Sequence, residues 1–207
     1  MTQVILYAGT TSWTVPANCT ATIECFGSGG NGLTGGVGSY YSANGGGGGG
    51  YANATSVSLT GGTTINVQIG AAGSQTDTWF NSSSYLLASA GNGSTHGSGS
   101  GTAATLTYTG QNGGYGAQSG TSAPSGNGGN CGGPSGSPYA GAGAVGAGAY
   151  SNGYNGSNYG GGGSGGCANG YTGGNGAAGL IVINYTPTGG GSYNTTQMFA
   201  MFPQGLF

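Results

Sequence analysis

The stretch ANGGGGGGY, residues 43–51, decides how this chain can fold. Its glycines carry no Cβ, so other backbones can approach the run from every side. In a helix with three residues per turn, glycine at one position in three gives only one face without side chains. The all-glycine run at residues 45–50, and a shorter one at residues 160–163, therefore predict segments of an inner layer that is flanked on both sides.

Glycine also recurs at every third residue in other parts of the chain. Period three is typical of the polyproline-II-type helix, which rises about 3.1 Å per residue and makes no internal hydrogen bonds. Such helices can satisfy their backbone groups by bonding to one another across glycine faces. Collagen fits less well, because the repeats change phase and the chain has only 6 prolines. The repeats are Gly29, Gly32, Gly35 and Gly38; Gly110, Gly113 and Gly116; Gly126, Gly129 and Gly132; Gly160, Gly163 and Gly166; and Gly170, Gly173 and Gly176.

Strand-like segments lie before, between and after these repeats. Residues 51–59 and 65–69 alternate apolar and polar side chains around Gly61-Gly62, a pattern that predicts a hairpin with positive φ at its turn. Residues 180–183 are continuously apolar and predict a buried strand that pairs with the first one. Further short strands are expected at residues 3–7, 13–16, 17–26, 79–80, 85–88 and 103–108.

These patterns predict a mostly non-α fold, a bundle of short polyglycine-II helices capped by a small antiparallel β-sheet or sandwich. We expect this domain to span residues 1–187, followed by a linker at 188–196 and an apolar tail at 197–207. An uncharged tail this apolar should be buried against a partner, so we interpret it as an assembly anchor. Its large apolar side chains are Met198, Phe199, Met201, Phe202, Leu206 and Phe207.

The composition argues against several classes of function. The 207 residues include no Lys or Arg, two acids (Glu24 and Asp77) and one His (His96). Binding to nucleic acids or to anionic lipid surfaces depends largely on Lys and Arg, so neither partner is expected. No signal peptide and no run of membrane-spanning length is visible, so membrane insertion is not expected. Three scattered ionisable groups predict no enzymatic activity, no metal and no cofactor.

Four cysteines allow three disulfide pairings. Cys19 and Cys25 lie on one face of an expected strand but roughly 20 Å apart, so they cannot bridge each other. Cys131 with Cys167 is the candidate pair. Four buried free thiols are an equal alternative for a protein made in a cytoplasm.

Tyrosines punctuate the glycine segments, mostly beside Ser, Asn or Gly. This is the composition of antibody paratopes, in which Tyr offers stiff contact area and small residues adapt around it, and it also suits carbohydrate. Alternatively, the rings cover helix ends, and both interpretations stay open. The candidate receptor-binding residues are Tyr40, Tyr41, Tyr139, Tyr150, Tyr154 and Tyr159.

Three stretches carry a resemblance to a known family: SWTVPA at residues 12–17, the run at 45–73, and GAAGLIVINYTP at 176–187. They resemble the glycine-rich domain of bacteriophage tail fibres and related virion proteins, over roughly residues 10–187. A looser similarity is to tail-tip adhesins of T-even-like phages, whose polyglycine helices display variable loops at their far ends. No fibre-attachment domain is obvious ahead of the glycine region.

The resemblance implies a non-enzymatic structural protein on the virion surface, extracellular after lysis of the host. Its implied role is host attachment as a tail-fibre tip or receptor-binding adhesin, which recognises a surface glycan or outer-membrane protein through Tyr/Asn/Ser/Gly loops. The expected partners are that host receptor and, through the tail, other virion proteins or copies of the chain in a homo-oligomer. Capsid decoration or a spike is an alternative, and ice binding, as in the glycine-helix antifreeze proteins of springtails, is an alternative of another class.

Overall fold

The computed structural model describes residues 1–37, 41–117 and 124–188, and it contains strands but no helix within these ranges. The expectation of a mostly non-α fold is therefore confirmed. The expected apolar tail, most of the expected linker and Tyr40 lie outside the described residues. In chain order the strands are β1 (Thr2–Leu6), β2 (Ser12–Thr14), β3 (Cys19–Phe26), β4 (Tyr51–Leu59), β5 (Thr64–Gln68), β6 (Thr78–Phe80), β7 (Leu86–Ala88), β8 (Gly99–Ser100), β9 (Leu106–Tyr108) and β10 (Leu180–Pro187).

The strands form two antiparallel five-stranded sheets. The first has the order β1-β10-β3-β4-β9 and the second the order β2-β5-β6-β7-β8. β1 pairs with β10 along its whole length, from Thr2 opposite Tyr185 to Leu6 opposite Ile181. The predicted pairing of the first and last strands is thus confirmed.

The predicted hairpin between residues 51 and 69 is wrong. β4 pairs with β3 and β9, whereas β5 pairs with β2 and β6, so the two strands belong to different sheets. Gly62 does take a positive φ, 79°, but its N–H donates to the carbonyl of Val15 (2.8 Å) and the turn crosses from one sheet to the other. Alternation of apolar and polar residues tells which side of a strand is buried. Two strands show the same alternation whether they pair in a hairpin or face each other across a core from different sheets.

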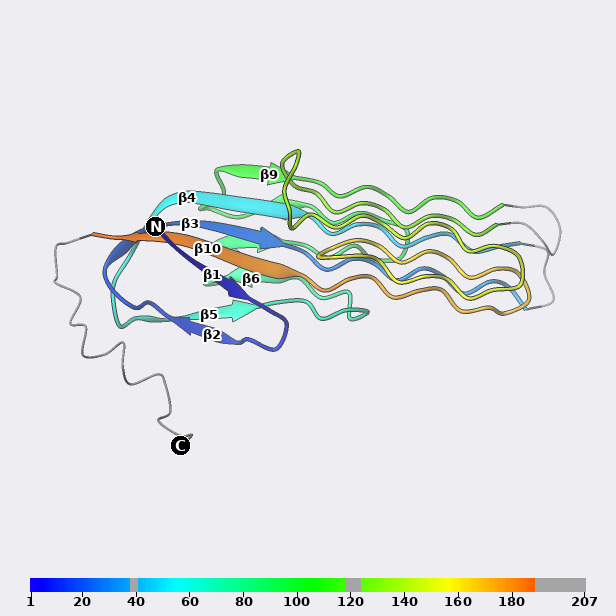
Figure 1. Cartoon of the computed structure of the whole chain (residues 1–207), viewed down its shortest axis with the longest axis horizontal. Helices are drawn as coiled ribbons and strands as arrows, with labels where there is room; N and C mark the ends of the chain where they lie inside the picture. Colours follow the sequence, from blue (N-terminus) through cyan, green and yellow to red (C-terminus); the bar gives the residue numbers. More distant parts are fainter. Residues whose placement is uncertain (38–40, 118–123, 189–207) are drawn as a thin grey trace, which may run out of the picture.

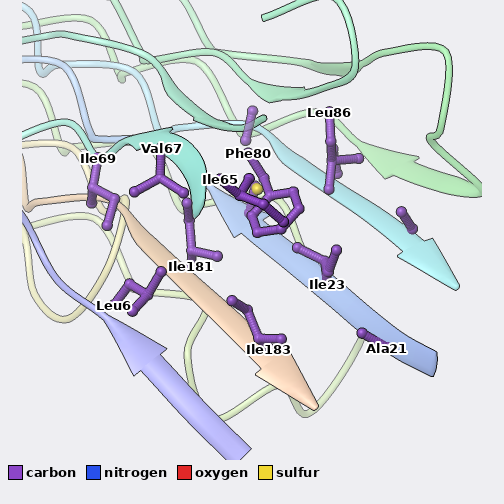
Figure 2. Close-up of a cluster of buried hydrophobic side chains, with 14 of the residues drawn as sticks. Leu6, Ala21, Ile23, Ile65, Val67, Ile69, Phe80, Leu86, Ile181 and Ile183 are labelled. Carbon is purple, nitrogen blue, oxygen red and sulfur yellow. The ribbon is translucent and has the colours of Figure 1, made fainter. Parts of the chain in front are cut away.

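The apolar core lies between the two sheets. Ile23 and Ile181 of the first sheet and Ile65, Val67 and Phe80 of the second belong to one buried cluster. Figure 2 shows these side chains converging from both sheets. Burial of this cluster holds the sheets together, since each fully buried Ile, Val or Phe contributes about 1.5–3 kcal/mol in gross terms.

The glycine segments continue directly from the strands. Residues 27–37 follow β3, residues 41–50 lead into β4, and residues 171–179 lead into β10. Figure 1 shows them as long traces that run side by side beyond one end of the sheets. They belong to neither sheet, yet their backbones are extensively hydrogen-bonded to one another.

The bonds around residues 45–50 rotate from one neighbour to the next with a period of three. Consecutive N–H groups donate to different segments, and the fourth donor returns to the segment that the first one used. This rotation is what three residues per turn requires. The bonds are Gly46 to Gly163 (2.7 Å), Gly47 to Gly93 (2.7 Å), Gly48 to Gln111 (2.8 Å) and Gly49 to Gly160 (2.8 Å).

Two segments are enclosed by others. Residues 45–50 and 160–168 are buried throughout, which confirms the prediction of an inner layer. A Cβ on Gly47 would collide with the carbonyl oxygen of Thr95, and a Cβ on Gly48 with that of Asn130. The inner run must therefore be glycine, because its neighbours are backbones. Residues 45–50 exchange backbone hydrogen bonds with residues 27–30, 89–93, 97, 111–114, 129–132 and 160–163.

Candidate functional site

Among the described residues, the end of the glycine segments farthest from the sheets includes residues 36–37, 41–42, 147–151 and 167–171, here called the far-end turns (Figure 1). They are tied to one another by hydrogen bonds. Asn169 donates its N–H to the carbonyl of Gly36 (3.0 Å), and the thiol of Cys167 donates to the carbonyl of Gly148 (2.6 Å). These bonds give the end of the bundle a defined shape.

Large side chains stand exposed on the far-end turns. Val37 is 88% exposed, Tyr41 58% and Tyr150 56%. Tyr150 has a φ of 57°, and Asn169 a φ of 68°. A left-handed backbone is uncommon for Tyr and tends to persist where surrounding structure imposes it, often at binding sites. The far-end turns thus combine an imposed backbone conformation with exposed aromatic area.

The other candidate tyrosines lie elsewhere. Tyr139 and Tyr159 pack against the buried cluster of Phe26, Leu180 and Val182 beside the first sheet. The ring of Tyr139 lies 6.1 Å from that of Phe26, and its hydroxyl is 3.3 Å from Gln3 Oε1. Tyr139 and Tyr159 therefore have a structural role, because their rings cover the glycine segments where these meet the first sheet.

Tyr154 is 57% exposed, and its backbone N–H donates to Ser164 Oγ (2.8 Å) in a glycine segment away from these turns. Of the proposed tyrosine set, the structure therefore places Tyr41 and Tyr150 at the far end, and Tyr154 along the bundle.

The ionisable side chains are dispersed among structural hydrogen bonds. Glu24 accepts from the Tyr51 hydroxyl (2.7 Å), Asp77 accepts from the N–H of Ala90 (2.9 Å), and His96 Nδ1 lies 2.7 Å from Asn112 Oδ1. Burial, and then the hydrogen bond to Glu24, raise the pKa of Tyr51. Within the described ranges, no three His, Cys, Asp or Glu side chains gather where they could hold a metal ion.

The cysteines do not pair in this structure. All four are free thiols, so the expected disulfide between Cys131 and Cys167 is wrong and the alternative of free thiols holds. The Cys131 thiol lies beside Gly160. Cys167 is seven residues after Gly160 along an extended segment, so at about 3.1 Å per residue the two thiols are roughly 20 Å apart. Burial raises the pKa of Cys131 to about 12.

Asparagine side chains bracket the outer glycine segments, a role that the sequence reasoning missed. In each case the side-chain oxygen accepts a backbone N–H of a neighbouring segment, so these donors are satisfied at the edge of the bundle. The detectable signal was the spacing of three residues between Asn127 and Asn130 and between Asn152 and Asn155. The bonds are Asn31 from Gly176 (2.9 Å), Asn44 from Gly116 (3.0 Å), Asn127 from Gly146 (2.6 Å), Asn130 from Gly143 (2.9 Å), Asn152 from Thr172 (3.0 Å) and Asn155 from Asn175 (2.8 Å).

No protein-family model matches the chain, and no curated protein matches it. Among the described residues, no helix has the length and apolar character needed to cross a bilayer. The function is therefore inferred from the geometry of the bundle and its ends.

Proposed function

We propose that the chain is a non-catalytic structural protein of a bacteriophage surface, a tail-fibre tip or receptor-binding adhesin that contacts the host through the far-end turns. The observation that carries this proposal is the exposure of Val37, Tyr41 and Tyr150 at the end of the bundle opposite the sheets. The N-terminus lies at the sheets (Figure 1), and the N–H of Thr188 bonds to Asn18 (2.8 Å) beside β3. A surface protein could be attached to the particle at the end with the sheets and contact the host at the far-end turns.

The proposal includes a finer description of the fold, in which the glycine segments are polyglycine-II helices and the two sheets a sandwich-like cap. Two observations support it. The backbone hydrogen bonds of residues 45–50 rotate among neighbours with a period of three, and the buried cluster draws side chains from both sheets. A bundle closed by backbone bonds is a rigid support, and loops on a rigid scaffold are where binding residues concentrate.

The chemistry of the far end favours contact by neutral groups. The described far-end turns carry no charged side chain, while Tyr41 and Tyr150 expose aromatic area. Tyrosine contributes large contact area at low entropic cost, and neighbouring Ser, Asn and Gly residues add hydrogen bonds. A surface glycan or the outer loops of an outer-membrane protein would suit such a contact.

The proposal is tested by measuring how well the purified chain competes with the source phage for binding to host cells. Purified chain should block adsorption of the source phage to its bacterial host. Combining Tyr41→Ser with Tyr150→Asn should weaken blocking by at least about tenfold, as expected for the loss of central aromatic contacts. Asn is chosen because it tolerates positive φ.

Tyr154→Ser supplies the matched control, since Tyr154 is as exposed as the two far-end tyrosines but lies away from these turns. It should block adsorption like the unaltered chain. Full blocking by the far-end variant, or no blocking by the unaltered chain, would contradict the proposed function.

A further inference from the structure

One outer side of the bundle is a row of three glycine segments, residues 109–117, 124–132 and 140–147. Backbone bonds join the row, from Gln111 to Asn130 (2.8 Å) and from Gly128 to Ala144 (2.8 Å). A shallow groove of about 340 Å³ lies over these three segments. We call it the amide face, after the side chains along it: Gln111, Asn112, Asn127 and Asn130, with Ala144 and Val145.

The amide groups on this face are held in fixed orientations. Asn127 Oδ1 accepts the N–H of Gly146 (2.6 Å), and Asn130 Oδ1 accepts that of Gly143 (2.9 Å). Because the backbone donors engage the oxygens, each side chain keeps an NH₂ group with two donors. Asn112 is fixed similarly, since its Oδ1 accepts the N–H of His96 (3.0 Å). The groove thus presents oriented amide donors along its length.

Side chains keep a further polypeptide backbone from joining this side of the bundle. Inside the bundle, a glycine on one segment lets the backbone of the next approach closely, as at Gly48, where a Cβ would collide with the carbonyl oxygen of Asn130. On the amide face, Asn127 and Asn130 are exposed and their side chains reach across to the next segment. An additional glycine helix would have to displace the Asn127 and Asn130 side chains from their hydrogen bonds to Gly146 and Gly143. The face therefore suits a ligand that hydrogen-bonds to the amide groups.

The groove also has apolar area and little charge. Val145 lines the groove and is 75% exposed. Tyr115 lies outside the lining, is 89% exposed, and is in phase with Asn112 at three residues per turn. His96 is the one ionisable side chain hydrogen-bonded to the named amides. No cationic side chain lines the groove to offset the desolvation of a phosphate, sulfate or carboxylate.

We propose that the amide face binds a neutral, extended oligosaccharide lying along the bundle axis. Sugar hydroxyls both donate and accept, so they can pair with the amide NH₂ groups, while sugar ring faces cover Val145 and Tyr115. Asn127 and Asn130 are separated by about 9 Å along the axis at the rise of this helix type, comparable to two linked sugar rings. This site is distinct from the far-end turns and does not depend on their role.

Calorimetric titration of the full chain tests the site with defined probes. Cellohexaose, maltohexaose and chitohexaose are the neutral oligosaccharides, hexagalacturonic acid is the acidic one, and hexaglycine is the peptide. At least one neutral hexasaccharide should bind, and the acidic sugar and the peptide should not. The double variant Asn127→Asp with Asn130→Asp keeps both bracketing oxygens but removes the NH₂ donors. It should bind about tenfold more weakly or worse, the effect of losing two hydrogen bonds.

The matched control is Asn152→Asp with Asn155→Asp, which makes the same change at two brackets outside the groove. It should bind the sugar like the unaltered chain, and both double variants should melt near the temperature of the unaltered chain. The proposal fails if no neutral hexasaccharide binds, if the acidic sugar or hexaglycine binds best, or if the Asn127/Asn130 variant binds normally. None of these results bears on adsorption through Tyr41 and Tyr150.

Discussion

Single glycines in the inner run are required by close approach of backbones rather than by backbone conformation. Gly46, Gly47 and Gly48 do not have positive φ values, yet a Cβ on any of them would collide with a carbonyl group of a neighbouring segment. Because the colliding atoms are backbone, no rotamer change can relieve the clash. Any side chain at these positions must push two segments apart.

Replacing Gly47 by Ala should therefore destabilise the chain strongly. We expect the free energy of unfolding to fall by about 3 kcal/mol or more, at the upper end of the cost of overpacking. Urea denaturation followed by tryptophan fluorescence measures the change. Gly148→Ala is the control, because Gly148 has ordinary φ and open space around it, and it should change stability by less than about 0.5 kcal/mol. Equal stability of the two variants would contradict the close-packed inner run.

The cysteines allow a second test at this scale. All four are free, and burial raises the pKa of both Cys25 and Cys131. Since the thiolate is the reactive form, the folded chain should react only slowly with Ellman's reagent at pH 8. Unfolding in guanidinium chloride without reductant should release all four thiols. Detection of only two thiols would mean that one pair of cysteines is joined by a disulfide, contrary to this structure.

At the scale of elements, most strands could be predicted because their signal is local. Alternation in β3 and β5 and the apolar run in β10 each report burial directly. Which strand pairs with which could not be read in the same way. β4 and β5 are separated by a two-glycine turn, but β5 pairs with β2 and lies across the core from β4's sheet.

For the glycine segments too, local sequence predicted some features but not the contacts between segments. The run at residues 45–50 predicted its own inner position, because absence of side chains is itself a packing signal. The asparagine brackets were missed, since an asparagine in a polar low-complexity stretch looks like a solvated residue. Only the neighbouring segment, many residues away, shows that Asn127 must accept the N–H of Gly146.

The apolar tail at residues 197–207 carries a prediction of its own. Six large apolar side chains could contribute on the order of 1.5–3 kcal/mol each when buried against a partner, before ordering costs. The Gly189-Gly190-Gly191 sequence ahead of the tail is a flexible linker composition. Deleting residues 197–207 should leave the glycine bundle folded and soluble but abolish incorporation into particles. Unfolding on deletion, seen by circular dichroism, would place the tail in the chain's own core instead.

At the scale of the whole molecule, two parts are held together by different interactions. The sheets enclose the main apolar cluster, including Phe80 and Leu86, whereas the bundle is joined mainly by backbone hydrogen bonds between glycine segments. Each such bond has a small net value in water, about 1 kcal/mol, but leaving a buried backbone group unpaired costs more. The bundle is therefore specified by how its backbone groups pair, and the sheets fix the ends from which its segments start.

The near absence of charge extends over the whole chain and gives the last prediction. With no Lys or Arg and two acids, the formal net charge is −2, so the chain has few charges with which to form ion pairs. Salt weakens interactions between exposed charges and steers charged partners, but it has little effect on ring stacking and neutral hydrogen bonds. Adsorption competition by the purified chain should therefore change less than about twofold between roughly 50 and 500 mM sodium chloride. Measuring the competing concentration at several salt levels checks this, with a lysine-rich binding protein as the salt-sensitive control. A steep loss at high salt would mean that charges on the host surface meet charges on this chain, and contact through neutral tyrosines at the far end would then be wrong.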